Sequence, residues 1–489
     1  MTPCRRLLDR LSPTYRHHTS RPHFIFSLPP PISHHPTPSH PIPSHPTASR
    51  IQNGPPPLPT HLSKLLSLAP PQSAHPPSTL TGPLTSHTGL AYLFLAVSAD
   101  HPRLQVHSYP AIHWARAYIS NIPAPSAPLV PFRGGGGGDG TTRSTEDHPV
   151  VLGLLSDALA SPAVRACITQ DLAHVRFFLS LLAPVMDHIL AAPAGTTASP
   201  ALEPGTPPPL PTCLLHGLAG TLYLLRLIRH WVPSSAPLVS RAIVHVSEYL
   251  LSPSTPWTCP SRSPPHRTPP PPLSERPSPA DRHGAAHGDL GTITQLVLTA
   301  VPRPPPLRPA GPPAPQRRLA FPGPPRHPAP SDGHGADRTR RPPPAPHAEA
   351  ASGGVGFASG PQGLVISLLS LRPFFPALRG RVDDAIARAR EFLWARAREP
   401  APASEANLFY GVLGTALAFP KGPQRTHLLS LASPSPPERQ PSPQSAAGAT
   451  PAAGAAAPGS LMTSASPGSA WAHSVSEREM PRMVFYNDV

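Results

Sequence analysis

Cysteine and histidine are the side chains in this sequence that could bind a metal or transfer a proton. Cys213 lies three residues before His216, and a Cys-x-x-His pair can bind zinc. A cysteine at helical spacing on an apolar face is, however, more often part of a core. The other cysteine–histidine cluster stands in and after a proline-rich stretch and comprises Cys259, His266, His283 and His287. Its spacings match no zinc template, so neither group alone predicts a metal site.

Pairs of glycines three residues apart recur directly before apolar stretches. They occur in the sequences HGLAG (216–220), HGDLG (287–291), GPQG (360–363) and GVLG (411–414). Such a turn lets the backbone pass close to a neighbour and begin a helix without obstruction by a side chain. One match would mean little, but four matches that each lead into a helix predict an internal repeat of helical hairpins.

The order of these turns resembles the lanthionine synthetase C-like family, in particular its eukaryotic, fungal-type branch. The resemblance covers a little over half of the chain, and the stretches that carry it are 87–95 (HTGLAYLFL), 214–233, 284–298, 358–376, 407–419, 468–471 and 481–489. It implies an α/α toroid, in which an inner ring of helices lies inside an outer ring and the glycine-rich turns line one mouth. We expect this toroid to be incomplete, with at least one inner helix missing or replaced.

The resemblance also implies a zinc site, from which this sequence departs. The family holds zinc with a cysteine from one Cys-His-Gly turn and a Cys-His pair from a later turn. The metal activates a thiol, which then adds to dehydroalanine or dehydrobutyrine. Here Ala358-Ser359 and Phe409-Tyr410 stand at those turns. Ala358, Phe409 and Tyr410 occupy the three ligand positions, so we expect no cofactor in this chain.

His287 stands in the turn that supplies a histidine near the metal in the family. The resemblance implies that His287 is a general acid or base, which would protonate the enolate formed by thiol addition. The alternative is a turn histidine that caps a helix or hydrogen-bonds to backbone. His216 occurs in an earlier turn, for which a structural role is the better interpretation.

Three hypotheses about function follow from these residues. The first is an enzyme that adds thiols, either glutathione or a peptide cysteine, to dehydroamino acids, with its activity impaired in this copy. The second is a non-catalytic toroid that binds a peptide or another partner. The third is a defective gene model, because the family resemblance begins abruptly at Ala358 after a stretch rich in arginine and proline.

Apolar spacing predicts an all-α fold, and no alternating pattern of useful length predicts strands. The predicted helical segments are 90–97, 111–119, 150–192, 213–231, 238–251, 291–301, 364–371, 382–396 and 408–419. Pro162 and Pro184 are expected to divide the segment 150–192 into successive helices.

Composition predicts long stretches without packed structure, because 82 residues are proline and 34 are glycine. We expect a disordered leader rich in proline and histidine over 1–83, followed by the toroid over 84–489. Within the toroid, the expected disordered insertions are 121–147, 253–283, 302–357 and 421–466.

The charge and the cysteine content restrict the possible binding partners of the protein and the cellular compartment in which it acts. The net charge is +15, but the arginines are not interleaved with aromatic residues, so we expect no nucleic-acid partner. No apolar run approaches the roughly 18 residues of a membrane-spanning helix, so we expect no transmembrane segment. The four cysteines fit a reduced cytoplasmic protein. The N-terminal segment has no acidic residue between Asp9 and Asp100, so a mitochondrial transit peptide is the alternative, although the prolines of this segment oppose an amphipathic helix.

Overall fold

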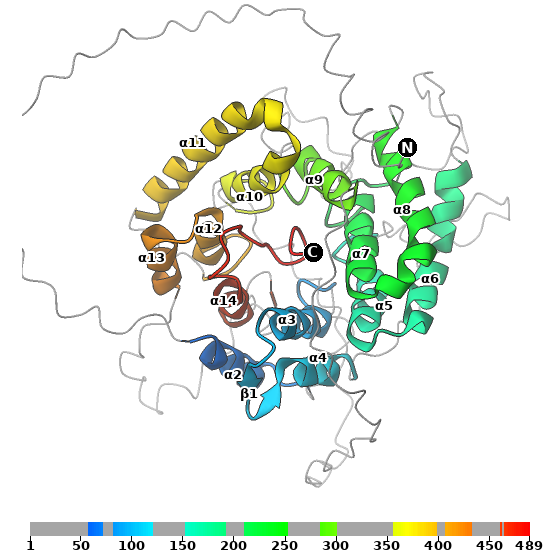
Figure 1. Cartoon of the computed structure of the whole chain (residues 1–489), viewed down its shortest axis with the longest axis horizontal. Helices are drawn as coiled ribbons and strands as arrows, with labels where there is room; N and C mark the ends of the chain where they lie inside the picture. The colour runs from blue at the N-terminus through cyan, green and yellow to red at the C-terminus, as the bar shows by residue number, and fades with distance from the viewer. Residues whose placement is uncertain are drawn as a thin grey trace, which may run out of the picture.

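The computed structural model describes residues 57–71, 82–120, 152–191, 210–252, 284–300, 356–398, 406–432, 460–461 and 464–489. Most of these residues are helical (Figure 1). Within the described ranges the only strands are β1 (Gln105–Val106) and β2 (Tyr109–Pro110), which form one antiparallel pair. The prediction of a helical protein is therefore confirmed for the part of the chain that the structure describes, apart from this short hairpin.

Seven of the described helices are largely buried. These inner helices are α3 (His87–Asp100), α5 (Asp157–Thr169), α7 (Leu218–Trp231), α9 (Asp289–Ala300), α10 (Pro361–Leu371), α12 (Val412–Ala418) and α14 (Ala465–Ser474). Six further helices bury one face each, and these outer helices are α2 (Leu58–Leu68), α4 (Ala111–Ser120), α6 (Leu172–Ala191), α8 (Ala236–Leu251), α11 (Arg379–Arg398) and α13 (Pro423–Leu431). The short 3₁₀ helices are η3 (Pro233–Ser235), η6 (Arg372–Phe374) and η7 (Pro376–Leu378).

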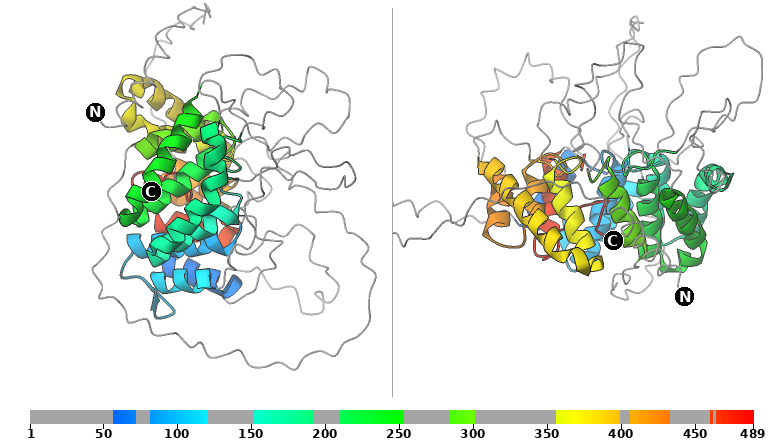
Figure 2. Two further views of the ribbon diagram at one scale, coloured as in Figure 1. Left: turned by 90° about the vertical axis from the view of Figure 1, so that its right-hand side faces the viewer. Right: turned by 90° about the horizontal axis from the view of Figure 1, so that it is seen from above.

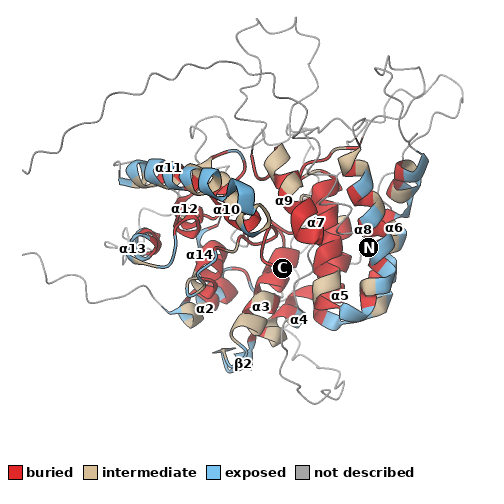
Figure 3. Ribbon diagram, turned by 45° about the horizontal axis from the view of Figure 1, so that its top comes forward, coloured by how far each residue is buried: buried red, intermediate tan, exposed pale blue. Residues whose placement is uncertain are grey.

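The inner helices follow one another through direct contacts. Along this series α3 packs on α5, α5 on α7, α7 on α9, α9 on α10, α10 on α12 and α12 on α14, and α14 packs in turn on α3. The outer helices α4, α6, α8, α11, α13 and α2 pack on α3, α5, α7, α10, α12 and α14 respectively. In Figure 2, left, α5 to α8 lie side by side, and Figure 3 shows the buried faces turned inward. The described residues include no helix that follows α9 as its outer companion.

The predicted glycine turns lead into α7, α9, α10 and α12. At Gly291 a methyl group would collide with the carbonyl oxygen of Ala285, six residues earlier. The same collision with the carbonyl six residues back occurs at Gly89, Gly220, Gly363 and Gly414. Glycine is therefore required at this position because the turn folds back onto the first turn of its own helix. Each of the four predicted glycine pairs therefore leads into a helix, although the hairpin expected after α9 is not seen in the described residues.

Two segments that were predicted to be disordered contain helices. Within the leader 1–83, α2 buries Leu62, Leu65 and Leu66, and within 421–466, α13 buries Leu428 and Leu429. Both helices have proline in their first turn, where the missing N–H has no intrahelical partner to lose. The prediction failed because proline content was read as disorder even where a proline begins a helix.

The remaining parts of those predictions mostly lie outside the described residues. The ranges 121–147 and 253–283 are not described at all. In 302–357 only Gly356 and Phe357 are described, and Phe357 is buried. The prediction of disorder is therefore wrong at the last residues of that range.

Pro162 and Pro184 do not divide helices as predicted. Pro162 lies inside α5 and Pro184 lies inside α6. A proline inside a helix removes one hydrogen bond and strains the preceding turn, at a cost of about 3 kcal/mol. The apolar faces of α5 and α6 are buried against their neighbours, and this packing outweighs the local cost.

One described helix, α6, is long and apolar enough to cross a membrane by length and composition alone. It contacts α5 and α8 and buries Val175, Phe178 and Leu182 on one face. Its other face carries charged residues such as Arg176 and Asp187. This arrangement is that of an outer helix of a helical hairpin.

The contact between α2 and α14 predicts a loss of stability in acid. His61 and His473 stack with ring centroids 4.3 Å apart. Burial, and then the neighbouring His61, lowers the pKa of His473 from 6.5 to about 4. The unfolded chain therefore takes up a proton that the folded chain excludes, and stability present above pH 6.5 falls as the pH drops toward 4. We expect the unfolding equilibrium constant to rise by up to about tenfold per pH unit in this window.

Chemical denaturation at several pH values measures this dependence. His473→Phe keeps the stacked ring but removes the titrating group, so its stability should vary less between pH 6.5 and 4. His427→Phe replaces an exposed histidine on α13 and serves as the matched control, with the wild-type dependence expected. An unchanged pH dependence in H473F would contradict this account of the α2–α14 contact.

Candidate functional site

The turns that carry the predicted site residues are joined to one another by backbone hydrogen bonds. The N–H of Leu214, before α7, donates to the carbonyl of Ala286, before α9, at 3.1 Å. The N–H of Ala286 donates to Ala358 O, before α10, also at 3.1 Å. The N–H of Phe357 donates to Phe409 O, before α12, at 2.6 Å. Four turns from distant parts of the sequence therefore form one continuous strip.

This strip brings together two histidines from different turns. His216 and His287 are both half-buried, and their rings stack with centroids 5.9 Å apart. His287 directly follows Ala286, whose N–H bonds to Ala358. The candidate acid or base therefore lies on the turn next to the one that carries the first ligand position.

The positions that the family resemblance assigns to zinc ligands hold no suitable donor set. Ala358 and Phe409 are buried, and a methyl group and a phenyl ring offer no lone pair to a metal. Tyr410 is half-buried, and its backbone N–H bonds to the side-chain oxygen of Asn407 at 2.7 Å. Ser359 is exposed and is a poor zinc ligand. The residues at these positions do not fit a zinc ion.

Aromatic packing fills the space beside these positions. The ring of Phe409 meets that of Phe357 edge-on at 5.2 Å, and Phe357 meets Tyr486 in the same way at 5.0 Å. Tyr486 belongs to the C-terminal segment, which we define as residues 481–489. A cysteine at position 409 would be much smaller than phenylalanine, so the aromatic cluster depends on the phenylalanine at this position.

The other candidate metal ligands do not form a cluster in the part of the chain that the structure describes. There, no group of three histidine, cysteine or acidic side chains is placed to hold a metal. Cys213 is buried in the turn before α7. Cys259, His266 and His283 lie outside the described residues.

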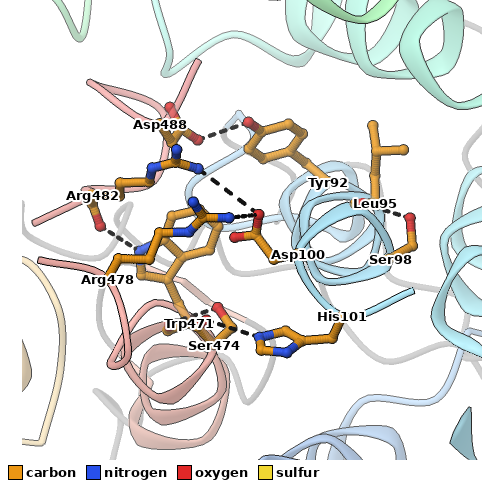
Figure 4. Close-up of polar contacts among 10 residues, drawn as sticks. All are labelled: Tyr92, Leu95, Ser98, Asp100, His101, Trp471, Ser474, Arg478, Arg482 and Asp488. Atoms are coloured by element: carbon orange, nitrogen blue, oxygen red, sulfur yellow. Dashed lines mark hydrogen bonds and ion pairs between the residues drawn. The ribbon is translucent and has the colours of Figure 1, made fainter. Parts of the chain in front are cut away.

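The C-terminal segment lies at the centre of the arrangement in Figure 1, surrounded by inner helices. Its residue Asp488 is buried, and its carboxylate accepts hydrogen bonds from Tyr92 of α3 at 2.7 Å and Tyr223 of α7 at 2.9 Å. Figure 4 shows the first of these bonds. Burial raises the pKa of Asp488, and the two phenol hydrogen bonds oppose that rise. Burial and then Asp488 raise the pKa of both tyrosines, which therefore stay protonated as donors.

Tyr486 adds contacts to three further inner positions. Its carbonyl accepts from Arg226 of α7 at 2.7 Å and from Gln295 of α9 at 3.1 Å. Its hydroxyl hydrogen-bonds with that of Ser367 of α10 at 2.5 Å. Together with Asp488, this residue links α3, α7, α9 and α10 to one segment.

Contacts with the end of α3 fix the path of the chain that leads from α14 into the C-terminal segment. Asp100 forms ion pairs with Arg478 and, at 3.9 Å, with Arg482 (Figure 4). The indole N–H of Trp471 donates to Arg482 O at 2.9 Å. These contacts direct the chain from α14 inward to Asp488.

Sequence reasoning found the turns but missed the polar contacts of the C-terminal segment. One residue could have indicated them, because Arg226 interrupts the otherwise apolar run LYLLRLI. A buried arginine requires acceptors, and here the Tyr486 carbonyl supplies one of them. The partner could not be identified, since Arg226 and Tyr486 are 260 residues apart in the sequence.

No protein family model matches this chain, and no curated protein is significantly similar to it. The function proposed for the chain therefore depends on its own residues and on the resemblance of the glycine-rich turns.

The contacts of Asp488 predict a strong effect of its removal on stability. Asp488→Ala would leave the buried hydroxyls of Tyr92 and Tyr223 without this acceptor, at about 1–3 kcal/mol for each group. Asp488→Asn keeps one acceptor and should destabilise less. Asp187→Ala removes an exposed carboxylate on α6 and should change stability by less than about 0.5 kcal/mol.

Urea unfolding monitored by tryptophan fluorescence compares the three variants with the wild type. Equal midpoints for D488A and the wild type would show that the C-terminal segment does not support the inner helices.

Proposed function

We propose that the chain is a lanthionine synthetase C-like α/α toroid in which zinc-dependent thiol addition is impaired. The succession of contacts from α3 to α14 and back to α3 supports a ring that closes, rather than one that lacks an inner helix. The outer layer is less regular, because no outer helix follows α9 among the described helices, whereas an outer helix packs on each of the other inner helices.

The observation that carries this proposal is the apolar filling of the ligand positions. Ala358 and Phe409 are buried, and Phe409 belongs to the cluster with Phe357 and Tyr486. When zinc is bound in the family, it lowers the pKa of the substrate thiol. Without such activation a thiol keeps a pKa of about 8.5, and only a minor fraction is thiolate at neutral pH.

His287 is the residue that would carry any remaining chemistry. A general acid or base typically contributes about 10²- to 10⁴-fold to a rate when its partner is in place. His287 is half-buried, and its ring stacks on that of His216 with centroids 5.9 Å apart. Because no metal activates a thiol here, His287 alone should give no measurable acceleration. The substrates for the family's reaction are glutathione, or a peptide cysteine, and a dehydroamino-acid peptide.

The second candidate function is non-catalytic binding of a peptide by the turn strip. The favouring observation is that His216, His287, Ser359 and Tyr410 occupy the same position in four successive turns, and each is half-buried or exposed. A row of polar side chains at equivalent positions can hydrogen-bond to an extended backbone.

We further infer that the protein acts in the cytoplasm and without a nucleic-acid partner. Cys167 and Cys213 are buried and are not joined in a disulfide, as expected in a reducing compartment.

Restoring the family ligands tests the proposed function. The triple variant A358C/F409C/Y410H should gain close to one zinc per chain, because it supplies two thiolates and one imidazole from adjacent turns. The variant A358S/F409S/Y410F makes similar changes in volume without thiolate or imidazole donors and should gain none. The wild type should not accelerate the addition of glutathione to a dehydroalanine peptide.

Elemental analysis and a thiol-addition assay on the three folded proteins measure these outcomes. Catalysis by the wild type would refute the proposed impairment. Absence of zinc from a folded A358C/F409C/Y410H variant would refute the assignment of these positions to the family's metal site.

A further inference from the structure

The outward face of α11 is exposed along its length and carries charges of both signs (Figure 3). Arg381 and Arg388 are seven residues apart, and so are Asp384 and Glu391. Residues that are three, four or seven positions apart lie on one face of a helix, so the four side chains are neighbours. All four residues are exposed. We call them the charge patch of α11.

The charge patch forms no ion pair within the described part of the chain. The adjacent Asp383, in contrast, pairs with Arg372 at 2.7 Å and with Arg379 at 3.9 Å. The residues that α11 buries lie on its opposite face, and they are Ile386, Ala389 and Leu393. The packing of α11 on α10 and α12 therefore leaves the charge patch open to another molecule.

The charge patch is complementary to itself when two copies of α11 lie antiparallel. A two-fold axis at the level of Ile386 brings to the same height any two residues that are equally distant from Ile386 in the sequence. Arg381 and Glu391 are each five residues from Ile386, and Arg388 and Asp384 are each two residues from it. Because α-helical residues rise by a constant amount, each arginine of one copy then meets a carboxylate of the other copy. The symmetry repeats both pairs, which gives four ion pairs across the contact.

An apolar contact follows the same symmetry. Phe392 is 54% exposed, which is unusual for a phenylalanine on a helix whose other face is buried. A groove at the beginning of α11 is lined in part by the apolar side chains of Leu368, Leu378 and Val382. Phe392 lies six residues after Ile386, whereas Leu378 and Val382 lie eight and four residues before it. In the antiparallel pair, Phe392 of one copy therefore reaches the level of the groove in the other copy.

We propose that α11 joins two copies of this chain into an antiparallel dimer through the charge patch and Phe392. The contact of one helix with another is at the small end of specific interfaces, so the expected dissociation constant is in the micromolar range. The net charge of +15 opposes association at long range. This repulsion is screened beyond about 8 Å at physiological ionic strength, whereas the paired side chains are in direct contact. The proposal uses no residue of the turn strip and is independent of the function proposed above.

Charge reversal in the full-length protein tests this contact, with analytical ultracentrifugation over micromolar concentrations as the measurement. The variants R381E/R388E and D384R/E391R each place like charges opposite one another, so each should self-associate at least about tenfold more weakly than the wild type. An equimolar mixture of the two variants restores all four pairs and should form a heterodimer. Both variants keep a positive net charge, because each changes the value of +15 by only four, so overall attraction cannot produce this heterodimer.

Two further variants separate the contact from general effects of charge. R116E/R176E lowers the net charge as much as R381E/R388E does, but it changes exposed arginines of α4 and α6. It should self-associate like the wild type. F392A removes the apolar contact and should weaken self-association with an unchanged circular dichroism spectrum, because the phenylalanine is exposed in the single chain.

Several outcomes would overturn the proposal. These are a wild type that stays monomeric at every concentration, undiminished self-association of R381E/R388E, and a mixture of the two folded charge-reversal variants that forms no heterodimer. Loss of self-association in R116E/R176E would also overturn it, because association would then depend on net charge or on another surface.

Discussion

The buried carboxylate of Asp488 is the contact on which the arrangement of the inner helices depends. It joins Tyr92 of α3 to Tyr223 of α7, two residues that are 131 positions apart, as their numbers show. A buried carboxylate is costly unless it is hydrogen-bonded, so α3 and α7 must be close enough for both phenols to reach it. The same segment places Tyr486 against Arg226 and Ser367, which extends the constraint to α10.

This central segment also connects the stability of the fold to the chemistry of the turns. Tyr486 packs on Phe357, and Phe357 packs on Phe409, one of the positions that holds a zinc ligand in the family that the turns resemble. Phe409 is therefore integrated into the core.

The packing around Phe357 also bears on the possibility of a defective gene model. Family resemblance begins at Ala358, but the two residues before it already belong to the same turn. Phe357 is fully buried and donates its N–H to Phe409 O, and a side chain at Gly356 would meet that carbonyl. The turn is thus complete from Gly356 onward.

Much of the helical structure could be predicted from local sequence patterns. The glycine pairs located the beginnings of α7, α9, α10 and α12, because close backbone approach restricts those positions to glycine. The prolines were misleading, since Pro59 lies in the first turn of α2 and Pro162 lies inside α5. Local patterns distinguish poorly between a proline that ends a helix and one that packing tolerates.

The candidate site was predictable only in part. The positions of His287, Ala358, Phe409 and Tyr410 on adjacent turns followed from the repeat, because equivalent residues of a repeat lie at equivalent places. The role of the C-terminal segment did not follow from the repeat, because Tyr92 and Asp488 are 396 residues apart and neither has an unusual neighbourhood in the sequence. Contacts of this kind depend on the whole fold.

The most direct test of the central claim is the zinc content of the wild-type protein, purified after expression in zinc-supplemented medium and measured by elemental analysis. If aromatic packing has replaced the metal site, the protein should contain less than about 0.1 zinc per chain, because no donor set remains at the ligand positions. A tightly held zinc in close to one-to-one ratio would contradict the account and would direct attention to Cys259 and His287 as substitute ligands.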